Sequence, residues 1–214
     1  MSIKLKHSGG NSVSLNPPTS APTSSDVAFK LPNADGSSGQ ALKTDGSGNL
    51  SFGGTGITEF DHYYLTSNWT TSGDALMTSW ARVTTSVAAS SASPLGSGVS
   101  HSSGTFSFPS TGKYLVIVNG VFEIVSDDHI YILVKVTQNN SSYVTYGTAT
   151  DGNGGSATRN GSGTAFVFID VTDTSNVKVR FHADSISSGS NISGPINAYV
   201  PVQTSLFFIR IGDT

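Results

Sequence analysis

Short runs in which apolar and polar residues alternate constrain this sequence more than any other feature. The run Val177–Ala183 places Val179 and Phe181 on one face and charged or polar side chains on the other, as expected of a half-buried strand. Ile130–Thr137 alternates in the same way. Lys113–Ile124 is apolar on both faces, which is typical of a strand in the middle of a sheet. We find no convincing helical spacing, so the sequence predicts an all-β protein.

These runs divide the 214 residues into two parts. Residues 57–214 hold the long runs, and their spacing by turn signals indicates a β-sandwich or jelly roll. Residues 1–56 hold short runs separated by Pro- and Gly-rich turns, and residues 53–56 form the expected joint. The first part has too few apolar residues to bury a core alone. We therefore expect a small β-rich stem in which three copies pool their apolar side chains around one axis.

The composition excludes several classes of function. Cysteine is absent, so the chain has no disulfide, thiolate metal site or cysteine nucleophile. Only 12% of the residues are charged and the net charge is −3, without the basic patch that nucleic acids favour. The longest apolar run, Tyr114–Val118, is far too short to span a membrane, and the N-terminus lacks the apolar region of a secretory signal. We expect assembly in a reducing cytoplasm, without membrane insertion or a nucleic-acid partner.

One segment of the first part follows the pattern Q-x-L-x-T-x-G-x-G-x-L-x-F. The matching residues are Gln40, Leu42, Thr44, Gly46, Gly48, Leu50 and Phe52. The segment resembles a short module of phage fibre and appendage proteins, and its setting is similar to that in marine phages and cyanophages. The resemblance implies a trimeric stem or collar next to a receptor-facing head. It also implies that the protein is located in the virion and that residues 1–56 attach it to other virion proteins.

A second pattern begins at residue 104. Its positions are Gly104, Phe106 or Phe108, Pro109, Gly112 and Tyr114. They resemble the G-x-F-x-x-P-x-x-G-x-Y signature of the complement globular head and tumour necrosis factor superfamily. Residues 161–181 and 204–214 resemble later strands of that family in the correct order. In residues 172–176 the turn chemistry departs from the family's Gly-Asp pattern.

The superfamily resemblance implies a C-terminal jelly-roll β-sandwich that forms a homotrimer. In that family, aromatic residues of the inner sheets meet near the three-fold axis. The residues that we expect in the trimer core are Phe106, Tyr114, Phe122, Phe166, Phe168, Phe207 and Phe208.

No catalytic constellation is recognisable. The sequence lacks a G-x-S-x-G elbow, and none of its five histidines has a distinctive motif context. We therefore expect neither enzyme activity nor a cofactor. Ca²⁺ is the one ion to consider, because it prefers oxygen ligands in turns. The candidate ligands are Asp127, Asp128 and Asp151.

The expected function is that of a virion structural protein, a trimeric tail-fibre or appendage component that mediates attachment to the host surface. Its partner would be a host cell-surface glycan or protein, contacted through exposed loops. The candidates for stacking on such a ligand are Tyr143, Tyr146 and Tyr199. Two alternatives stay open. One is a capsid decoration or horn protein with a purely structural role, and the other is a sugar-cleaving fibre tip, which would need paired carboxylates such as Asp61 and Glu123.

Overall fold

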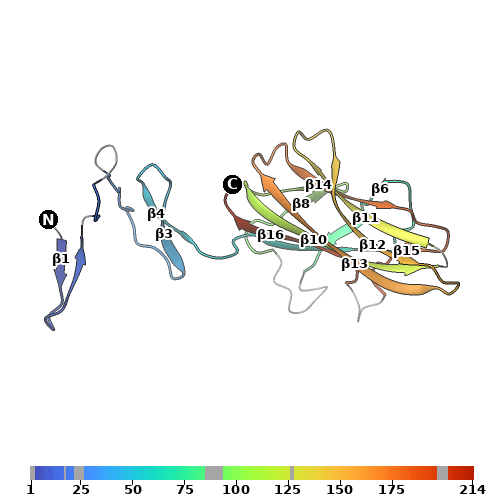
Figure 1. The fold of residues 1–214 in the computed structure, drawn as a ribbon, viewed down its shortest axis with the longest axis horizontal. Helices are drawn as coiled ribbons and strands as arrows, with labels where there is room; N and C mark the ends of the chain where they lie inside the picture. Colours follow the sequence, from blue (N-terminus) through green and yellow to red (C-terminus); the bar gives the residue numbers. More distant parts are fainter. Residues whose placement is uncertain (1–2, 17, 22–26, 85–93, 126–127, 197–201) are drawn as a thin grey trace. The chain divides into compact units, whose positions relative to one another are not determined.

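The computed structural model describes residues 3–16, 18–21, 27–84, 94–125, 128–196 and 202–214 (Figure 1). Every regular element within these residues is a β-strand, so the all-β prediction is confirmed. The chain forms two compact units, Met1–Thr55 and Gly56–Thr214. We call them the stem unit and the head unit, and the division between them falls at the Gly-rich joint.

The stem unit contains two antiparallel hairpins. Strands β1 (Ile3–Lys6) and β2 (Ser12–Leu15) form the first, and β3 (Gln40–Thr44) and β4 (Leu50–Gly54) form the second. Apolar side chains remain exposed throughout the described part of this unit: Leu5, Leu15, Val27, Phe29, Leu31, Leu42 and Phe52. A single copy of the stem unit therefore leaves unburied the side chains from which a core would be built.

The turn between β3 and β4 accounts for Asp45 and for Gly48, one of the glycines in the Gln40–Phe52 pattern. Asp45 Oδ1 accepts hydrogen bonds from the backbone N–H groups of Ser47 (2.8 Å) and Asn49 (3.1 Å). These bonds, and above all one from the Asn49 side chain, lower the pKa of Asp45. Gly48 has a φ of 88°, and an added Cβ would lie 2.6 Å from the Ala28 carbonyl oxygen. Only glycine fits there, because both the backbone conformation and the neighbouring segment exclude a side chain.

The head unit is a sandwich of two antiparallel sheets. The first sheet has the strand order β13-β10-β16-β5-β7, and β15 pairs with β10 beside this path. Its strands are β5 (Phe60–Leu65), β7 (Trp80–Arg82), β10 (Gly112–Ile124), β13 (Arg159–Val171), β15 (Asn191–Ile192) and β16 (Ser205–Gly212). The C-terminal strand β16 lies between β10 and β5, so the backbone groups along both of its edges are paired, as expected for a terminal apolar strand.

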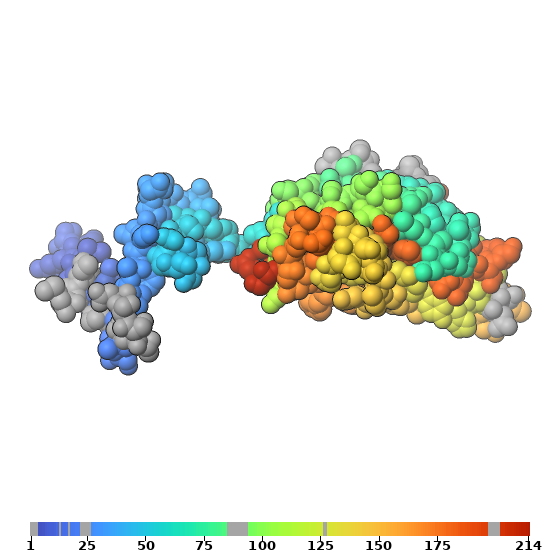
Figure 2. All heavy atoms as spheres, turned by 90° about the horizontal axis from the view of Figure 1, so that it is seen from above, coloured from blue at the N-terminus to red at the C-terminus, as the bar shows by residue number. Residues whose placement is uncertain are grey.

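The second sheet has the order β12-β11-β14-β9-β8, and β6 pairs with β14. Its strands are β6 (Ala75–Leu76), β8 (Ser100–Ser102), β9 (Thr105–Ser107), β11 (Asp128–Thr137), β12 (Val144–Asn153) and β14 (Lys178–Asp184). In Figure 2 the yellow turn between β11 and β12 lies against the orange segment before β14, and the Asn140 N–H donates to the Asn176 carbonyl (2.9 Å). Two facing antiparallel sheets with these crossovers make the predicted jelly roll, which is confirmed.

An aromatic cluster forms the centre of the sandwich core. Phe106 of the second sheet stacks on Phe208 of the first, with ring centroids 5.2 Å apart. Tyr63 and Phe181 meet Phe106 edge-on at 5.1 and 5.5 Å. Edge-to-face and offset pairs of this kind add to the stability gained from burial alone. The register allows these contacts because one face of each strand points into the sandwich.

Four of the residues predicted for the trimer core belong to this interior instead. Phe106, Tyr114, Phe122 and Phe208 are at most 1% exposed in a single chain. Side chains so completely enclosed by their own subunit cannot contact another one. The prediction is therefore wrong for these four, because the resemblance that marked them does not distinguish aromatic residues that face the sandwich interior from those on the outward face of the sheet.

Candidate functional site

The outward face of the first sheet carries a band of apolar side chains. Strand register places Phe60, Ile209, Leu115 and Phe168 in one row across β5, β16, β10 and β13, and His62, Phe207, Ile117 and Phe166 in the next. We call these eight residues the apolar band. Phe166 and Phe168 are 64% and 67% exposed. Large side chains of this kind are rarely left in water side by side unless they form a contact surface.

The band follows from the composition of its central strands. Along β10 the residues alternate between the sandwich interior and the outward face, and both sets are apolar near Leu115 and Ile117. Along β16, Phe208 points inward while Phe207 points outward. Since one face of each strand fills the core, no described part of the head unit covers the second apolar face, which is left on the outside of the sheet. This doubly apolar pattern of β10 and β16 is the sequence signal for three band residues that the trimer-core prediction missed, Leu115, Ile117 and Ile209. The prediction also missed Phe60 and His62, which lie on β5, where the charged Asp61 interrupts any such pattern.

Polar residues border the band along the strands. In the row beyond Phe166, Thr164 Oγ1 hydrogen bonds to Asn119 Oδ1 at 3.2 Å. In the row beyond Phe168, Lys113 lies opposite Asp170. An apolar centre with a polar rim is the usual anatomy of a protein–protein interface. The remaining three residues predicted for the trimer core, Phe166, Phe168 and Phe207, lie in this band.

His62 places a titratable group within the band. Its ring stacks on Phe207, with centroids 4.2 Å apart and planes inclined by 16°. Burial lowers the pKa of His62, and the charge of the adjacent Asp61 offsets only part of this effect. The His62 imidazole therefore stays neutral to a lower pH than an ordinary histidine does.

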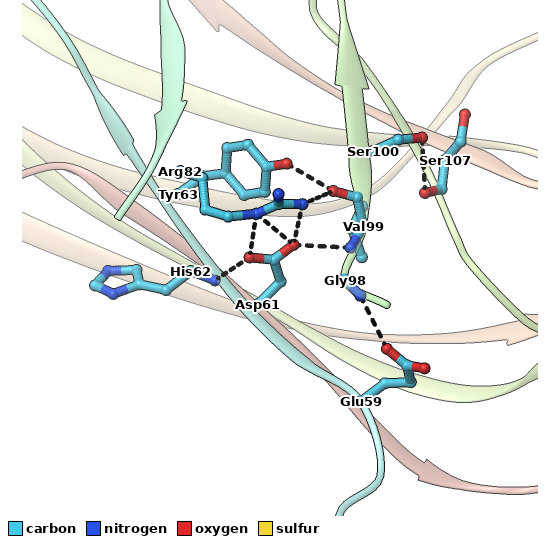
Figure 3. Close-up of polar contacts among 9 residues, drawn as sticks. All are labelled: Glu59, Asp61, His62, Tyr63, Arg82, Gly98, Val99, Ser100 and Ser107. Atoms are coloured by element: carbon cyan, nitrogen blue, oxygen red, sulfur yellow. Dashed lines mark hydrogen bonds and ion pairs between the residues drawn. The ribbon is translucent and has the colours of Figure 1, made fainter. Parts of the chain in front are cut away.

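Asp61 lies on the opposite side of β5 and anchors the Arg82 side chain (Figure 3). Arg82 Nε and Nη2 donate to the Asp61 carboxylate at 2.9–3.1 Å, and Val99 N–H donates to Asp61 Oδ2 at 2.8 Å. Arg82 Nη2 also donates to the Val99 carbonyl (2.8 Å), as does the Tyr63 hydroxyl (2.6 Å). Burial, followed by the charge of Asp61, raises the pKa of Tyr63 to about 12. Asp61 therefore fixes the segment before β8, which is a structural role and not that of a catalytic acid.

The predicted receptor-facing tyrosines differ in their surroundings. The guanidinium of Arg180 lies 4.0 Å above the centre of the Tyr143 ring, so this ring already stacks on its own sheet. Tyr146, on β12, is 51% exposed. Tyr199 falls outside the described residues. Among the described tyrosines of this prediction, Tyr146 is thus the one whose side chain is mainly open to solvent.

The candidate Ca²⁺ ligands do not come together in the described residues. Asp128 accepts hydrogen bonds from the Ser187 N–H (3.1 Å) and hydroxyl (2.9 Å), and serine hydrogen bonds lower its pKa although burial alone would raise it. Asp151 forms an ion pair with Arg159 (2.7 Å). Asp127 falls outside the described residues. Within the described ranges, no cluster of three or more acidic or histidine side chains could hold a metal ion.

Comparisons with known proteins identify the fold through similar structures, not through similar sequences. No protein-family model matches the chain, and no curated protein does either. Among solved structures, murine APRIL is similar with a TM-score of 0.51 and 12% identity, over 72% of this chain and 98% of that one. The Eiger tumour necrosis factor of S. frugiperda is similar with a TM-score of 0.53 and 16% identity, over 72% and 93% of the two chains. The head unit therefore has the tumour necrosis factor-like jelly-roll fold. No helix in the described part of the chain has the length and apolar character to cross a membrane.

Proposed function

We propose that this chain is a non-enzymatic structural protein of a virion, a homotrimeric tail-fibre or appendage component that attaches the particle to its host. The observation that carries the proposal is the apolar band on the first sheet. In the trimer, the apolar band of each copy would be covered by the bands of the two other copies, which would enclose Phe166 and Phe168 around a three-fold axis. The resemblance of residues 104–124 to a superfamily of trimers supports this arrangement.

The stem unit supports the same stoichiometry independently. Its exposed apolar side chains include Leu42 and Phe52, which are paired across β3 and β4 and border a hollow of about 320 Å³ together with Leu31. Three copies would bury these side chains, whereas one copy leaves them in water. A trimeric stem then offers a support to which other virion proteins bind, as the resemblance of Gln40–Phe52 to a phage module implies.

The location in a virion and the attachment to a host rest on that phage-like module and on the division into stem and head. Exposed loops of the head unit would then bind a host cell-surface glycan or protein. The alternative of a sugar-cleaving fibre tip requires a pair of free carboxylates, and Asp61 was one candidate. The Asp61 carboxylate accepts hydrogen bonds from Arg82 and from the Val99 N–H, so it is not free for this role. The purely structural alternatives gain no specific support from the fold.

The decisive experiment combines assembly with adsorption. Sedimentation of the purified chain should give a species of three times the 22.1 kDa chain mass. Particles assembled without the protein should remain intact but adsorb poorly to host cells, and adding the purified trimer beforehand should compete with intact particles. Particles that lack the protein and still adsorb normally would remove the attachment role.

A further inference from the structure

A hollow of about 510 Å³ with a mixed polar and apolar lining lies at one end of the head unit. Its sides include Asn68, Val121, Glu123, Asn160, Ser193 and Gln203. It lies beside β15, at the end of the head unit opposite to the C-terminus and to the start of β5 (Figure 1). Ligand sites for small molecules commonly have volumes of about 300–1,000 Å³, so the hollow has room for one or two sugar rings.

One side of the hollow is held rigidly around Gly194. The Gly194 N–H donates to Asn68 Oδ1 (2.9 Å), and its carbonyl accepts from Gln203 Nε2 (2.7 Å). A Cβ at this position would lie 2.5 Å from the Ser67 carbonyl carbon, so the backbone packs directly on its neighbour. Preorganised sites of this kind lose little entropy when a ligand binds.

A second part of the lining is fixed in the same way by β10 and β15. Glu123 Oε2 accepts from Asn191 Nδ2 (3.1 Å), and the Ser193 N–H donates to the Val121 carbonyl (2.7 Å). Glu123, Asn68 and Gln203 thus each use one side-chain atom to hold the structure. In the described part of the chain, their second polar atoms and the Asn160 side chain make no hydrogen bond, so these groups remain available to a ligand.

The charge and the hydrogen-bonding groups of the hollow indicate the class of ligand that it would bind. Among the described residues that line the hollow, Glu123 is the one that carries a charge and none is basic, so anions are disfavoured. A carboxylate and several amides match hydroxyl groups, which donate and accept at once. Val121 and Ile196 add apolar contacts for the C–H faces of a ring. Cleavage of a glycosidic bond requires two carboxylates, and the described lining of the hollow supplies one, which favours binding without hydrolysis.

We propose that this hollow is a binding site for a neutral saccharide unit. The inference rests on the proposed attachment function and names the class of host ligand. Glu123 and Val121 belong to the same outward set of β10 residues as Leu115 and Ile117 of the apolar band. A trimer built on the band would therefore gather three hollows on one side of the assembly, and simultaneous binding of three sugars would multiply a weak single-site affinity.

Saturation-transfer NMR on the full-length protein tests the site directly. The probes are the methyl glycosides of glucose, galactose, mannose and N-acetylglucosamine, with methyl glucuronide as the anionic comparison. At least one neutral glycoside should receive saturation, and glucuronide should receive much less. If none of the four neutral glycosides binds, or if glucuronide binds equally well, the proposal is overturned.

Variants assign the binding to the hollow. Glu123→Gln keeps an acceptor for Asn191 but removes the charge, and Asn160→Ala removes an exposed side chain that supports no other residue. Each should weaken glycoside binding by about tenfold or more, the effect of losing a hydrogen bond to a charged or polar partner. Asp170→Asn, which removes a carboxylate elsewhere on β13, should bind as the wild type does. Wild-type affinity in both hollow variants would overturn the assignment.

The outcomes separate this inference from the proposed function. A chain that is trimeric and supports adsorption, yet binds none of the glycosides, refutes the saccharide site and leaves the attachment role intact. A chain that binds a glycoside through Glu123 while its particles adsorb without it refutes the attachment role and leaves the site.

Discussion

Replacing Phe166 and Phe168 with threonine tests the assembly directly. Threonine is β-branched and suits a strand, so the fold of a single head unit should be preserved. Each phenylalanine offers an area of ~200 Å², of which about two-thirds is exposed, so a partner would cover ~130 Å² per side chain. At ~25 cal/mol/Å² this burial contributes at most ~3 kcal/mol per side chain, or ~20 kcal/mol for six side chains in a trimer.

The smaller threonine side chains restore only part of this contribution, so the variant should dissociate to monomers at micromolar concentration, as measured by sedimentation velocity. The circular dichroism spectrum of the monomer should retain its β signature. Tyr146→Thr is the control, because this ring is likewise exposed, at 51%, but lies on the second sheet. If the double variant remains trimeric, the apolar band is not the subunit interface, and the argument from its exposure fails.

Three further predictions concern stability. The stability that neutral His62 contributes should be fully present above pH 6.5, the ordinary pKa of histidine, and should be lost as the pH falls towards the lowered pKa of His62 in the folded state. His62→Gln should therefore reduce the fall of the urea midpoint on acidification, and a pH profile unchanged by this variant would contradict the prediction. Asp61→Ala leaves Arg82 without its buried partner and should cost about 3–5 kcal/mol in the free energy of unfolding, whereas Asp170→Asn should cost almost nothing. Gly48→Ala should speed hydrogen exchange of the Leu50 amide more than Gly46→Ala does, since a Cβ meets the Ala28 carbonyl at residue 48 and open space at residue 46; equal rates would refute the steric argument.

The sequence by itself determined the secondary structure and the fold class. Alternation of the kind seen in Val177–Ala183 sets a strand with one buried face, because side chains on a pleated strand point alternately to its two sides. The glycines of the β3–β4 turn were likewise readable, since positive φ angles favour glycine. Local rules suffice for these features because neighbouring residues alone create them.

Tertiary structure decided which of two apolar faces is the core. Phe207 and Phe208 are adjacent and chemically identical, yet Phe208 is enclosed by Phe106 while Phe207 lies on the outward face. Nothing local distinguishes them, because the choice depends on which side of the first sheet the second sheet covers. For the same reason Phe106 and Phe122 were assigned to a subunit contact that their burial excludes.

The hollow beside β15 is the feature that the sequence predicted least. Asn68, Glu123 and Gln203 are widely separated along the chain and belong to no motif, and any β domain contains similar residues. They meet because β15 pairs with the end of β10 and brings the segment around Gly194 against Ser67. Periodicity therefore determines that this chain folds into strands, whereas the packing of distant segments determines which side chains remain available to a partner or a ligand.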